Sequence, residues 1–360
     1  MLTDLRLQNF RSYKEDTFEF SDGVNIIVGP NASGKTNLLE ALLVLARGSS
    51  YRAKDQELIM FSKPWARLDA HLANSSERIL KLVREPTPGK SYDIDGKPYR
   101  RLSLAHSLPA VLFEPNHLQL LSGGPEGRRA YLDDLLEQTA SGYGTLRRQY
   151  RRTLAQRNAL LKQGRHGHAQ LFPWDVRLSE LAGQIVRHRA SLVEQMNGKI
   201  TKLYGDLSHS KSNVTLHYAA RWPSDNYETN LLKKLESSAE FDTQRGFTSV
   251  GPHREDLDVM FDGHPAAEAA SRGEARTLVL GLKIIELQLL EAARSTTPLL
   301  LLDDVFSELD GTRRRALTSY LRDYQTFITT TDADVVIQNF TETTHIIPLS
   351  VPRANNRQGQ

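Results

Sequence analysis

Eight residues near the start of the chain have the types and spacing of a phosphate-binding loop. Gly29-Pro30-Asn31-Ala32-Ser33-Gly34-Lys35-Thr36 follows the pattern G-x-x-x-x-G-K-[ST]. In such a loop, backbone N–H groups point into one concavity, and the start of the next helix adds partial positive charge. Lys35 would place its ammonium on the β- and γ-phosphates, as a binding and catalytic residue, and Thr36 its hydroxyl on Mg²⁺. The spacing therefore predicts a nucleotide site made of all eight residues.

The segments on either side of this loop are the ones that phosphate binding requires. Val24–Val28 is a short apolar run, which predicts a buried strand. Residues 37–46 contain no Gly or Pro and are rich in Leu and Ala, which predicts a helix. A chance Gly-rich turn is the alternative, and the order of strand, loop and helix favours the phosphate site over it.

A second stretch with chemical potential lies far along the chain. Residues 299–304 are four leucines followed by Asp303 and Asp304, which predicts a buried strand ending in two acids. Asp303 would bind Mg²⁺, and Asp304 would act as the catalytic base that accepts a proton from the attacking water. The alternative is a strand that leads into a helix N-cap, where Asp is favoured. Because most of the chain separates Lys35 from Asp303, we expect a large insertion within one ATPase core.

A third motif specifies the class of ATPase. Ser271-Arg272-Gly273-Glu274 has the S-x-G-x form of the ABC-type signature, and a long helical pattern follows it. Ser271 and Gly273 would form a second phosphate site at the start of that helix. Alone, the motif is also that of an ordinary helix cap. Its place between the loop and Asp303 favours the signature, and Ser307–Asp310 has the form of the D-loop that follows the acidic pair in this class.

Composition limits the classes of protein that remain. The chain has 360 residues, enough for two lobes, and no cysteine, which excludes disulfides, thiolate zinc sites and cysteine nucleophiles. No apolar run approaches the ~20 residues of a membrane-spanning helix. The first residues lack the basic and then apolar order of a secretory signal. We therefore expect a cytoplasmic protein that does not bind membranes.

The positive charge of the chain is concentrated in one segment. The net charge is only +3, but residues 128–190 contain 12 Lys and Arg and 5 Asp and Glu, a net +7 that leaves −4 for the rest. This segment predicts contacts with the phosphates of double-stranded DNA. For any one arginine the alternative is a solvated helix face. No aromatic-rich platform for single strands is visible. The candidate contacts are Arg147, Arg148, Arg151 and Arg152.

The remaining patterns define the expected elements and lobes. Residues 1–107 are strand-rich, residues 125–204 have long helical patterns, and residues 249–263 predict a strand pair with a turn at Asp262-Gly263. Residues 164–174 predict a loop; its two histidines could suggest a metal site, but a solvated loop is favoured. We expect an α/β fold. Its parts would be an ATPase lobe at 1–108 and 265–350, an inserted helical and strand lobe at 109–264, and a polar tail at 351–360.

With these motifs in place, the chain resembles the RecF family, which is related to the Rad50 and SMC head domains. The resemblance covers nearly the whole sequence. General ABC-type ATPases lack the GGPEGRRAYLDD and GPHREDL stretches. The matching stretches are LQNFRSY (7–13), GPNASGKTNLLEA (29–41), FEPNHLQLLSGGPEGRRAYLDD (113–134), LAQRNALLK (154–162), PWD (173–175), GPHREDL (251–257), SRGE (271–274) and LLLLDDVFSELD (299–310).

The resemblance implies an ABC-type P-loop ATPase head of the Rad50/SMC kind, without a long coiled coil. It implies ATP and Mg²⁺ as cofactors and an ATP-dependent head-to-head homodimer on double-stranded DNA and at ssDNA–dsDNA junctions. RecR would be a partner, with RecO and RecA in the same pathway. The implied role is that of a recombination mediator in DNA replication, post-replication gap repair and the SOS response.

The sequence departs from the general ABC pattern at three places. Asp304 stands where most of these ATPases carry Glu, so we expect slow hydrolysis that serves as a switch. Residues 329–332, Thr-Thr-Thr-Asp, lack the usual switch histidine, and Phe113–Asn116 offers no glutamine for the Q-loop. The role of Gly251-Pro252-His253-Arg254 is open.

Two other functions fit part of the sequence. A P-loop small-molecule kinase would explain the loop at 29–36 but not the signature or the long insertion. The ATPase subunit of a membrane transporter would explain the three nucleotide motifs but not LQNFRSY, GPHRED or the basic segment. A DNA-binding ATPase switch accounts for all of these features.

Overall fold

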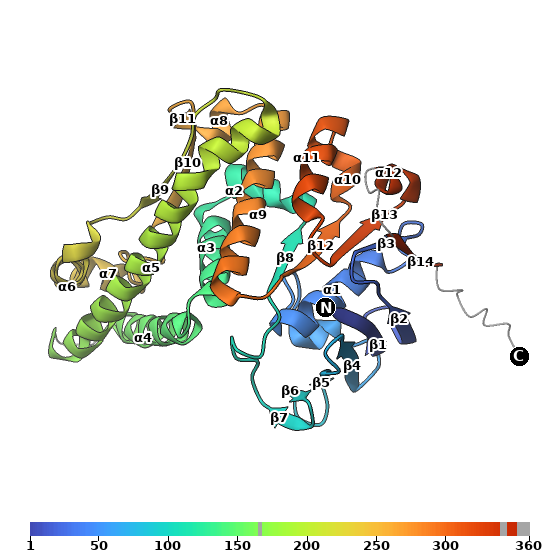
Figure 1. Ribbon diagram of the computed structural model, residues 1–360. Coiled ribbons are helices and arrows are strands. Elements are labelled where there is room, and N and C mark those ends of the chain that lie inside the picture. The colour runs from blue at the N-terminus through green and yellow to red at the C-terminus, as the bar shows by residue number, and fades with distance from the viewer. Residues whose placement is uncertain (165–167, 339–343, 351–360) are drawn as a thin grey trace, which may run out of the picture. The chain divides into compact units, whose positions relative to one another are not determined.

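Five parallel strands bring the two chemical stretches of the chain to one edge of a sheet. The strands lie in the order β14 (Thr344–Pro348), β3 (Val24–Val28), β13 (Thr326–Thr330), β12 (Leu299–Asp303) and β8 (Ala110–Phe113). Their apolar runs suit a sheet that is covered on both faces. Because all five run in one direction, the loop after β3 and the acids at the end of β12 lie at the same, carboxyl edge. Figure 1 shows β13 between these two strands.

One helix joins this sheet to a second, antiparallel one. The helix α1 (Lys35–Arg47) begins in the phosphate-binding loop, and its buried face shares one apolar cluster with both sheets. No Gly or Pro interrupts it, and Gly48 ends it in the left-handed conformation. The antiparallel strands, in sheet order, are β2 (Tyr13–Glu19), β1 (Leu2–Phe10), β4 (Trp65–Leu72), β5 (Glu77–Val83), β6 (Gly89–Ile94) and β7 (Lys97–Tyr99).

The computed structural model describes residues 1–164, 168–338 and 344–350. It divides into unit 1, Met1–His117 with Arg294–Gln360, and unit 2, Leu118–Ala293. These bounds differ from the expected insertion at 109–264. The strand β8 pairs with β12 inside unit 1. The helix before β12, Arg272–Arg294, packs inside unit 2, because the Tyr131 hydroxyl donates to the Leu282 carbonyl of that helix. Which lobe residues 265–293 serve in function stays a prediction.

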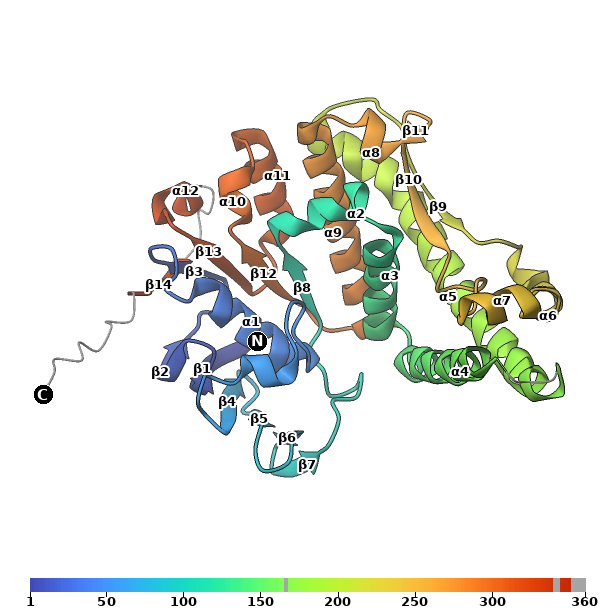
Figure 2. The ribbon, with the colours of Figure 1, turned by 180° about the vertical axis from the view of Figure 1, so that it is seen from behind.

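Unit 1 also contains the helices α10 (Val305–Glu308), α11 (Gly311–Leu321) and α12 (Ala333–Ile337). Unit 2 is mainly helical, and Figure 2 shows its helices from behind. Within the described ranges, no helix of either unit is long and apolar enough to cross a membrane. The helices of unit 2 are α2 (Gln119–Ser122), α3 (Pro125–Thr139), α4 (Tyr143–Gln163), α5 (His168–Ser208), α6 (Tyr227–Ser237), α7 (Ala239–Arg245), α8 (Ala266–Ala269) and α9 (Arg272–Arg294); its strands are β9 (Val214–Ala219), β10 (Asp256–Phe261) and β11 (His264–Pro265).

Most of the expected elements are confirmed, and one is wrong. The turn at Asp262-Gly263 joins β10 to β11 as predicted. The predicted loop at 164–174 is wrong, because α5 begins at His168 and contains Pro173. Pro173 lies near the start of that helix, where it removes a single backbone bond, and the buried Leu171 continues the apolar face. His166, one of the two histidines of that stretch, and the polar tail 351–360 lie outside the described residues.

Candidate nucleotide-binding site

The phosphate-binding loop has a backbone that its glycines make possible. Gly34 has φ +100, and a Cβ there would lie 2.9 Å from the Tyr13 hydroxyl. A Cβ on Gly29 would lie 2.5 Å from the Leu349 carbonyl oxygen. Both positions therefore exclude a side chain, one by backbone conformation and both by space. Ala32 also has a positive φ of 63, so the loop is tightly curved between its two glycines.

The polar groups of the loop point to an anionic ligand. The Lys35 ammonium donates to the carbonyls of Gly29, at 2.6 Å, and Pro30, at 2.9 Å, and so lies across the loop. The Ser33 hydroxyl is buried and has no hydrogen-bond partner in the part of the chain that the structure describes. An unsatisfied buried donor costs about 1–3 kcal/mol, which a ligand with acceptor oxygens would remove. The loop as built therefore fits nucleotide phosphates.

The carboxylate expected to bind metal lies beside the loop. The Thr36 hydroxyl donates to Asp303 Oδ1 at 3.0 Å, although 267 positions separate the two residues in the sequence. Thr329, the neighbour of Asp303 on β13, donates to the same oxygen at 2.7 Å. The structure thus brings together Thr36 and Asp303 as the sequence predicted, and it adds Thr329, which orients the carboxylate. A hydroxyl and one carboxylate, with phosphate oxygens and water, are a ligand set that suits Mg²⁺.

Asp304 has a left-handed backbone conformation, and its side chain forms no helix-cap hydrogen bond. It has φ 53, in the left-handed region, and it precedes α10 without making a side-chain cap bond. The helix-cap alternative therefore does not describe what its carboxylate does. Its backbone N–H donates to the Thr329 hydroxyl at 3.0 Å, which holds the strained position. The carboxylate is exposed at the same edge as Lys35, where a water could reach it.

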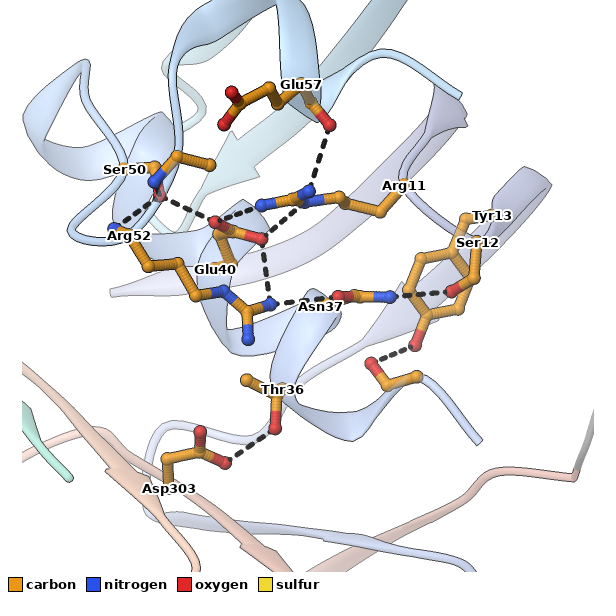
Figure 3. A network of polar contacts seen from close by, with 12 residues as sticks. Arg11, Ser12, Tyr13, Thr36, Asn37, Glu40, Ser50, Arg52, Glu57 and Asp303 are labelled. Atoms are coloured by element: carbon orange, nitrogen blue, oxygen red, sulfur yellow. Dashed lines mark hydrogen bonds and ion pairs between the residues drawn. The ribbon is translucent and has the colours of Figure 1, made fainter. Parts of the chain in front are cut away.

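Sequence reasoning missed a buried ionic network behind the loop, which Figure 3 shows. Glu40, on α1, is fully buried. Arg11 grips its carboxylate with two bonds of 2.8 and 3.0 Å, Arg52 adds a bond of 3.0 Å, and the Ser50 hydroxyl adds one of 2.6 Å. Burial raises the pKa of Glu40, but the hydrogen bonds from Arg11, Arg52 and Ser50 outweigh burial and hold that pKa below its usual value. Glu40 is therefore an anion that ties three segments together.

This network positions the start of α1. The Tyr13 hydroxyl donates to the Gly34 carbonyl at 3.0 Å, and the Asn37 amide donates to the Ser12 hydroxyl at 3.0 Å. Residues 11–13 therefore clamp both the loop and the first turn of α1 (Figure 3). The sequence held a signal for it, because Glu40 interrupts an otherwise apolar helix and a buried acid needs a cationic partner.

The region expected to hold a Q-loop glutamine holds an acid. Phe113 pairs with Leu302, so the next residue, Glu114, reaches the edge of the sheet at the level of Asp303. One Glu114 carboxylate oxygen lies 3.8 Å from His117 Nε2. Among the described residues there is no set of three or more His, Asp or Glu side chains placed to hold a metal.

In unit 2, two residues of the signature motif, Ser271 and Glu274, cap the start of a helix. The Glu274 carboxylate accepts from the Ser271 backbone N–H at 2.8 Å, and the Ser271 hydroxyl accepts from the Glu274 N–H at 3.4 Å. This reciprocal pair is a capping box at the start of α9. Gly273 lies in the first turn of α9. Ser271 is exposed, so the cap does not block a contact with phosphate.

The four candidate DNA contacts on α4 differ from one another. Arg147 lies 3.1 Å from Asp133 and 2.9 Å from Glu137, so carboxylates already engage its guanidinium. Arg148, Arg151 and Arg152 are exposed, and within the described ranges none forms an ion pair. Only the last three have the freedom that a phosphate contact requires.

Together, a parallel sheet, a phosphate-binding loop after one strand and a metal-facing acid two strands away define a P-loop ATPase. The sequence matches the family described as RecF/RecN/SMC N terminal domain over residues 1–349. It is 37% identical over 350 residues to the DNA replication and repair protein RecF of Microcystis aeruginosa, covering 92% of this chain and 93% of that protein. The RecF of Moorella thermoacetica is 35% identical, with 97% and 95% covered. The chain belongs to the RecF family.

Solved structures agree with this assignment. The recombination mediator protein RecF-ATPrS of the RecFOR pathway matches with a TM-score of 0.86 and 30% identity, covering 97% of both chains. The corresponding RecF-ATP structure matches with a TM-score of 0.84 and 31% identity, covering 93% of this chain and 94% of that one. An SMC head bound to the C-winged helix domain of ScpA has a TM-score of 0.54 at 17% identity over 96% and 93% of the chains, and it supports the fold alone.

Proposed function

We propose that this protein is an ATP-dependent recombination mediator that binds DNA during replication and repair. The observation that carries the proposal is the hydrogen bond between Thr36 and Asp303, which joins the phosphate-binding loop to the acidic strand end. Relatives matched over almost the whole chain are named DNA replication and repair protein RecF, and this favours a repair role over a kinase or a transporter subunit. A solved relative is described as RecF-ATP, which supports ATP as the nucleotide.

The residues of unit 1 supply the steps of nucleotide binding and hydrolysis. The loop residues 29–36 bind the phosphates, and Lys35 leaves its carbonyl partners to meet the β- and γ-phosphates. Thr36 and Asp303 would hold Mg²⁺, which when bound neutralises charge on the phosphates. Asp304 accepts a proton from the attacking water. Its side chain is one methylene shorter than Glu, so hydrolysis is slow and suits a switch that releases DNA.

The signature residues act across two chains in this proposal. Ser271 and Gly273 of one chain contact the γ-phosphate held by the loop of the other, and the two-fold arrangement gives two shared ATP molecules. ATP binding and dimerisation are then linked, because ATP forms part of the interface. The exposed position of Ser271 at the start of α9 supports this role.

DNA binding follows from the exposed arginines of unit 2. Arg148, Arg151 and Arg152 recur on one side of α4 and contact phosphates of double-stranded DNA, independently of sequence. The protein acts at ssDNA–dsDNA junctions in post-replication gap repair and the SOS response, with RecR as a partner and RecO and RecA in the same pathway. The description of the solved relatives as mediators in the RecFOR pathway supports these partners.

Sedimentation and DNA binding, measured with no nucleotide, ADP, ATP and a non-hydrolysable analogue, test the proposal. We expect ATP with Mg²⁺ to produce dimers and to tighten binding to a duplex, whereas ADP does neither.

Ser271→Arg should keep ATP affinity and lose dimerisation, because a bulky cation replaces a small donor at a close contact. Lys35→Met should lose ATP affinity itself. Asp304→Asn should keep both properties and slow hydrolysis. A wild type that stays monomeric with ATP, or a Ser271→Arg variant that dimerises normally, would show that the shared-site mechanism is wrong.

A further inference from the structure

Four side chains near the end of α7 form a series of contacts between aromatic rings and guanidinium groups. The Arg245 guanidinium carbon lies 4.6 Å from the centre of the Phe241 ring and 5.7 Å from that of Phe247. The Arg254 guanidinium carbon lies 5.0 Å from the centre of the Phe247 ring. We refer to Phe241, Arg245, Phe247 and Arg254 as the Phe–Arg ladder. All four belong to unit 2.

The ladder is open to solvent and carries uncompensated charge. Phe241 is 48% exposed, so part of its ring is open to a ligand. Arg245 and Arg254 are exposed as well. In the part of the chain that the structure describes, neither guanidinium forms an ion pair or donates a side-chain hydrogen bond, so their contacts are with the rings alone. Two positive charges and an exposed ring therefore lie side by side.

The backbone after α7 is shaped to build the ladder. Gly246 ends α7 in the left-handed conformation, at φ 71, and returns the chain so that Phe247 meets Arg245. Gly251 has φ 125, and a Cβ there would lie 2.9 Å from the Tyr150 hydroxyl. His253 bonds the Tyr150 hydroxyl at 2.6 Å through Nδ1 and the Thr248 carbonyl through Nε2 at 3.1 Å. These bonds hold the stretch Gly251-Pro252-His253-Arg254 in place. Its last residue, Arg254, lies against the Phe247 ring.

Buried and partly buried hydrogen bonds fasten the ladder to α4. The Arg157 guanidinium, fully buried on α4, donates to Asp242 of α7 at 2.8 Å. Asn158, the next residue of α4, accepts from the Thr248 N–H and hydroxyl at 2.8 and 2.7 Å. These contacts fix the segment that contains Phe247 against the helix that carries the proposed phosphate contacts. The two features therefore belong to one rigid surface.

A line of cations leads along α4 toward the ladder. Arg148, Arg151, Arg152 and Lys162 recur at spacings that place them on one side of the helix. We refer to these four residues as the α4 basic stripe. Lys162 lies at the ladder end, because a Cβ on Gly246 would be 3.3 Å from its Cγ. The stripe is about 21 Å long at 1.5 Å per residue, close to the rise of about six base pairs.

The two features suit different parts of a nucleic acid. A row of exposed cations fits the phosphates of a duplex. An exposed aromatic ring beside guanidinium groups fits unpaired bases, because bases stack on rings and phosphates pair with arginine. Paired bases are stacked inside a duplex and cannot reach a protein ring. An acidic peptide would satisfy the arginines and leave the Phe241 ring without a partner.

We propose that the Phe–Arg ladder binds the unpaired bases of a single strand where that strand leaves a duplex held along the α4 basic stripe. The proposal rests on the proposed DNA binding and assigns its junction contact to particular residues. A base stacks on the exposed ring of Phe241, and Arg245 and Arg254 pair with the phosphates on either side. The α4 basic stripe holds the last base pairs. The protein then distinguishes a junction from a continuous duplex without reading sequence.

Fluorescence anisotropy with two DNA probes tests the ladder. One probe is a blunt 20-base-pair duplex, and the other carries an eight-nucleotide overhang at its 3′ or 5′ end. With a non-hydrolysable ATP analogue present, wild type should bind one overhang polarity more tightly than the blunt duplex. Phe241→Ala should lose about 10-fold in affinity for that overhang, the scale of one stacked base. Its affinity for the blunt duplex should not change.

Three further variants make the result specific to stacking. Phe241→Trp should keep or increase the preference for the overhang. Phe61→Ala, which removes a 92% exposed ring in unit 1, is the matched control and should change neither probe. An overhang that lacks its bases should bind wild type and Phe241→Ala equally. Arg254→Gln should flatten the log–log salt dependence for the overhang by about one unit.

The outcomes separate this inference from the proposed function. Equal affinity of wild type for blunt and overhang probes, or an undiminished preference in Phe241→Ala, would overturn the ladder and leave duplex binding intact. An equal loss on both probes would also overturn it, because the ring would then serve the fold or the duplex contact. Failure of wild type to bind the blunt duplex at all would instead contradict the proposed function. Unfolding curves of Phe241→Ala and Phe61→Ala should match wild type, since both rings are exposed.

Discussion

His253 should make the stability of unit 2 depend on pH. Burial lowers the pKa of His253 to about 4 from its usual 6.5, the Thr248 carbonyl partly offsets this, and the nearby charges of Arg254, Arg129 and Arg189 lower it further. A carbonyl can only accept, so Nε2 carries the proton, and Nδ1 accepts from the Tyr150 hydroxyl. Protonation of Nδ1 would break the bond from Tyr150 and add a charge among three arginines.

The sign and the size follow from the two pKa values. The folded state binds the proton more weakly than the unfolded chain, so the contribution of His253 is fully present above pH ~6.5 and is lost as the pH falls toward ~4. Between pH 7.5 and 5, a shift from 6.5 to about 4 lowers the free energy of unfolding by ~2 kcal/mol. This is a large part of the margin of an ordinary domain.

Urea unfolding of wild type and His253→Gln at pH 7.5, 6.5, 5.5 and 5.0 measures this contribution. Glutamine keeps a donor and an acceptor but does not titrate in this range. Wild type should lose ~2 kcal/mol more than the variant between pH 7.5 and 5, and the variant should show only the slope of the other groups. The reasoning fails if both proteins lose the same free energy, because the proton taken up on unfolding would then belong to another residue.

Four further variants test the sites described above. Thr329→Val should lower the Mg²⁺-dependent affinity for ATP about 10-fold, because Asp303 loses a partner that orients it, and calorimetry with EDTA should show no such loss. Gly34→Ala should abolish ATP binding and lower the free energy of unfolding by about 1–2 kcal/mol, because φ +100 is strained for alanine and Cβ meets the Tyr13 hydroxyl; calorimetry and urea unfolding check the two effects. Arg147→Gln should lower the free energy of unfolding by about 1–3 kcal/mol and leave DNA affinity unchanged, since its guanidinium is held by carboxylates. A combined variant replaces Arg148, Arg151 and Arg152 with glutamine. Measured by fluorescence anisotropy with the blunt duplex, its log–log dependence of DNA affinity on salt should flatten by about two to three units.

The nucleotide site was predictable because each of its parts is local in sequence. The sequence of a loop between a strand and a helix determines the backbone conformation of that loop. An acid directly after an apolar strand lies at the carboxyl edge of the sheet. Parallel pairing then brings the parts together, since Asp303 and the loop follow strands that run in one direction. Thr329 was not predictable as a partner of Asp303. Its role depends on the order of strands, in which β13 lies between β3 and β12.

The Phe–Arg ladder shows the opposite case. Phe241 and Arg245 are close in sequence, but they form part of a larger surface only because Gly246 and Gly251 turn the chain twice. Arg254 then reaches Phe247 across a loop that partly buried hydrogen bonds hold in place. No local pattern carries this information. The sequence therefore offered no sign of an aromatic surface, although every residue of the ladder was visible in it.

The basic segment shows why charge counted along a chain is a poor measure of charge at a surface. Several of its arginines are paired with acids that lie outside residues 128–190. Arg128 pairs with Asp256, Arg157 with Asp242 and Arg187 with Glu228. The net +7 of the segment is thus partly neutralised by the fold.

The paired arginines serve the structure rather than a ligand. Arg157 is fully buried between Asp175 and Asp242, and a buried arginine without such partners would be costly. Arg189 is bound to Asp133 in the same way. The arginines that can still meet a phosphate are those that the fold leaves unpaired and exposed. On α4 these are confined to one side of the helix, and for this reason we expect DNA to lie along the α4 basic stripe rather than over the whole arginine-rich segment.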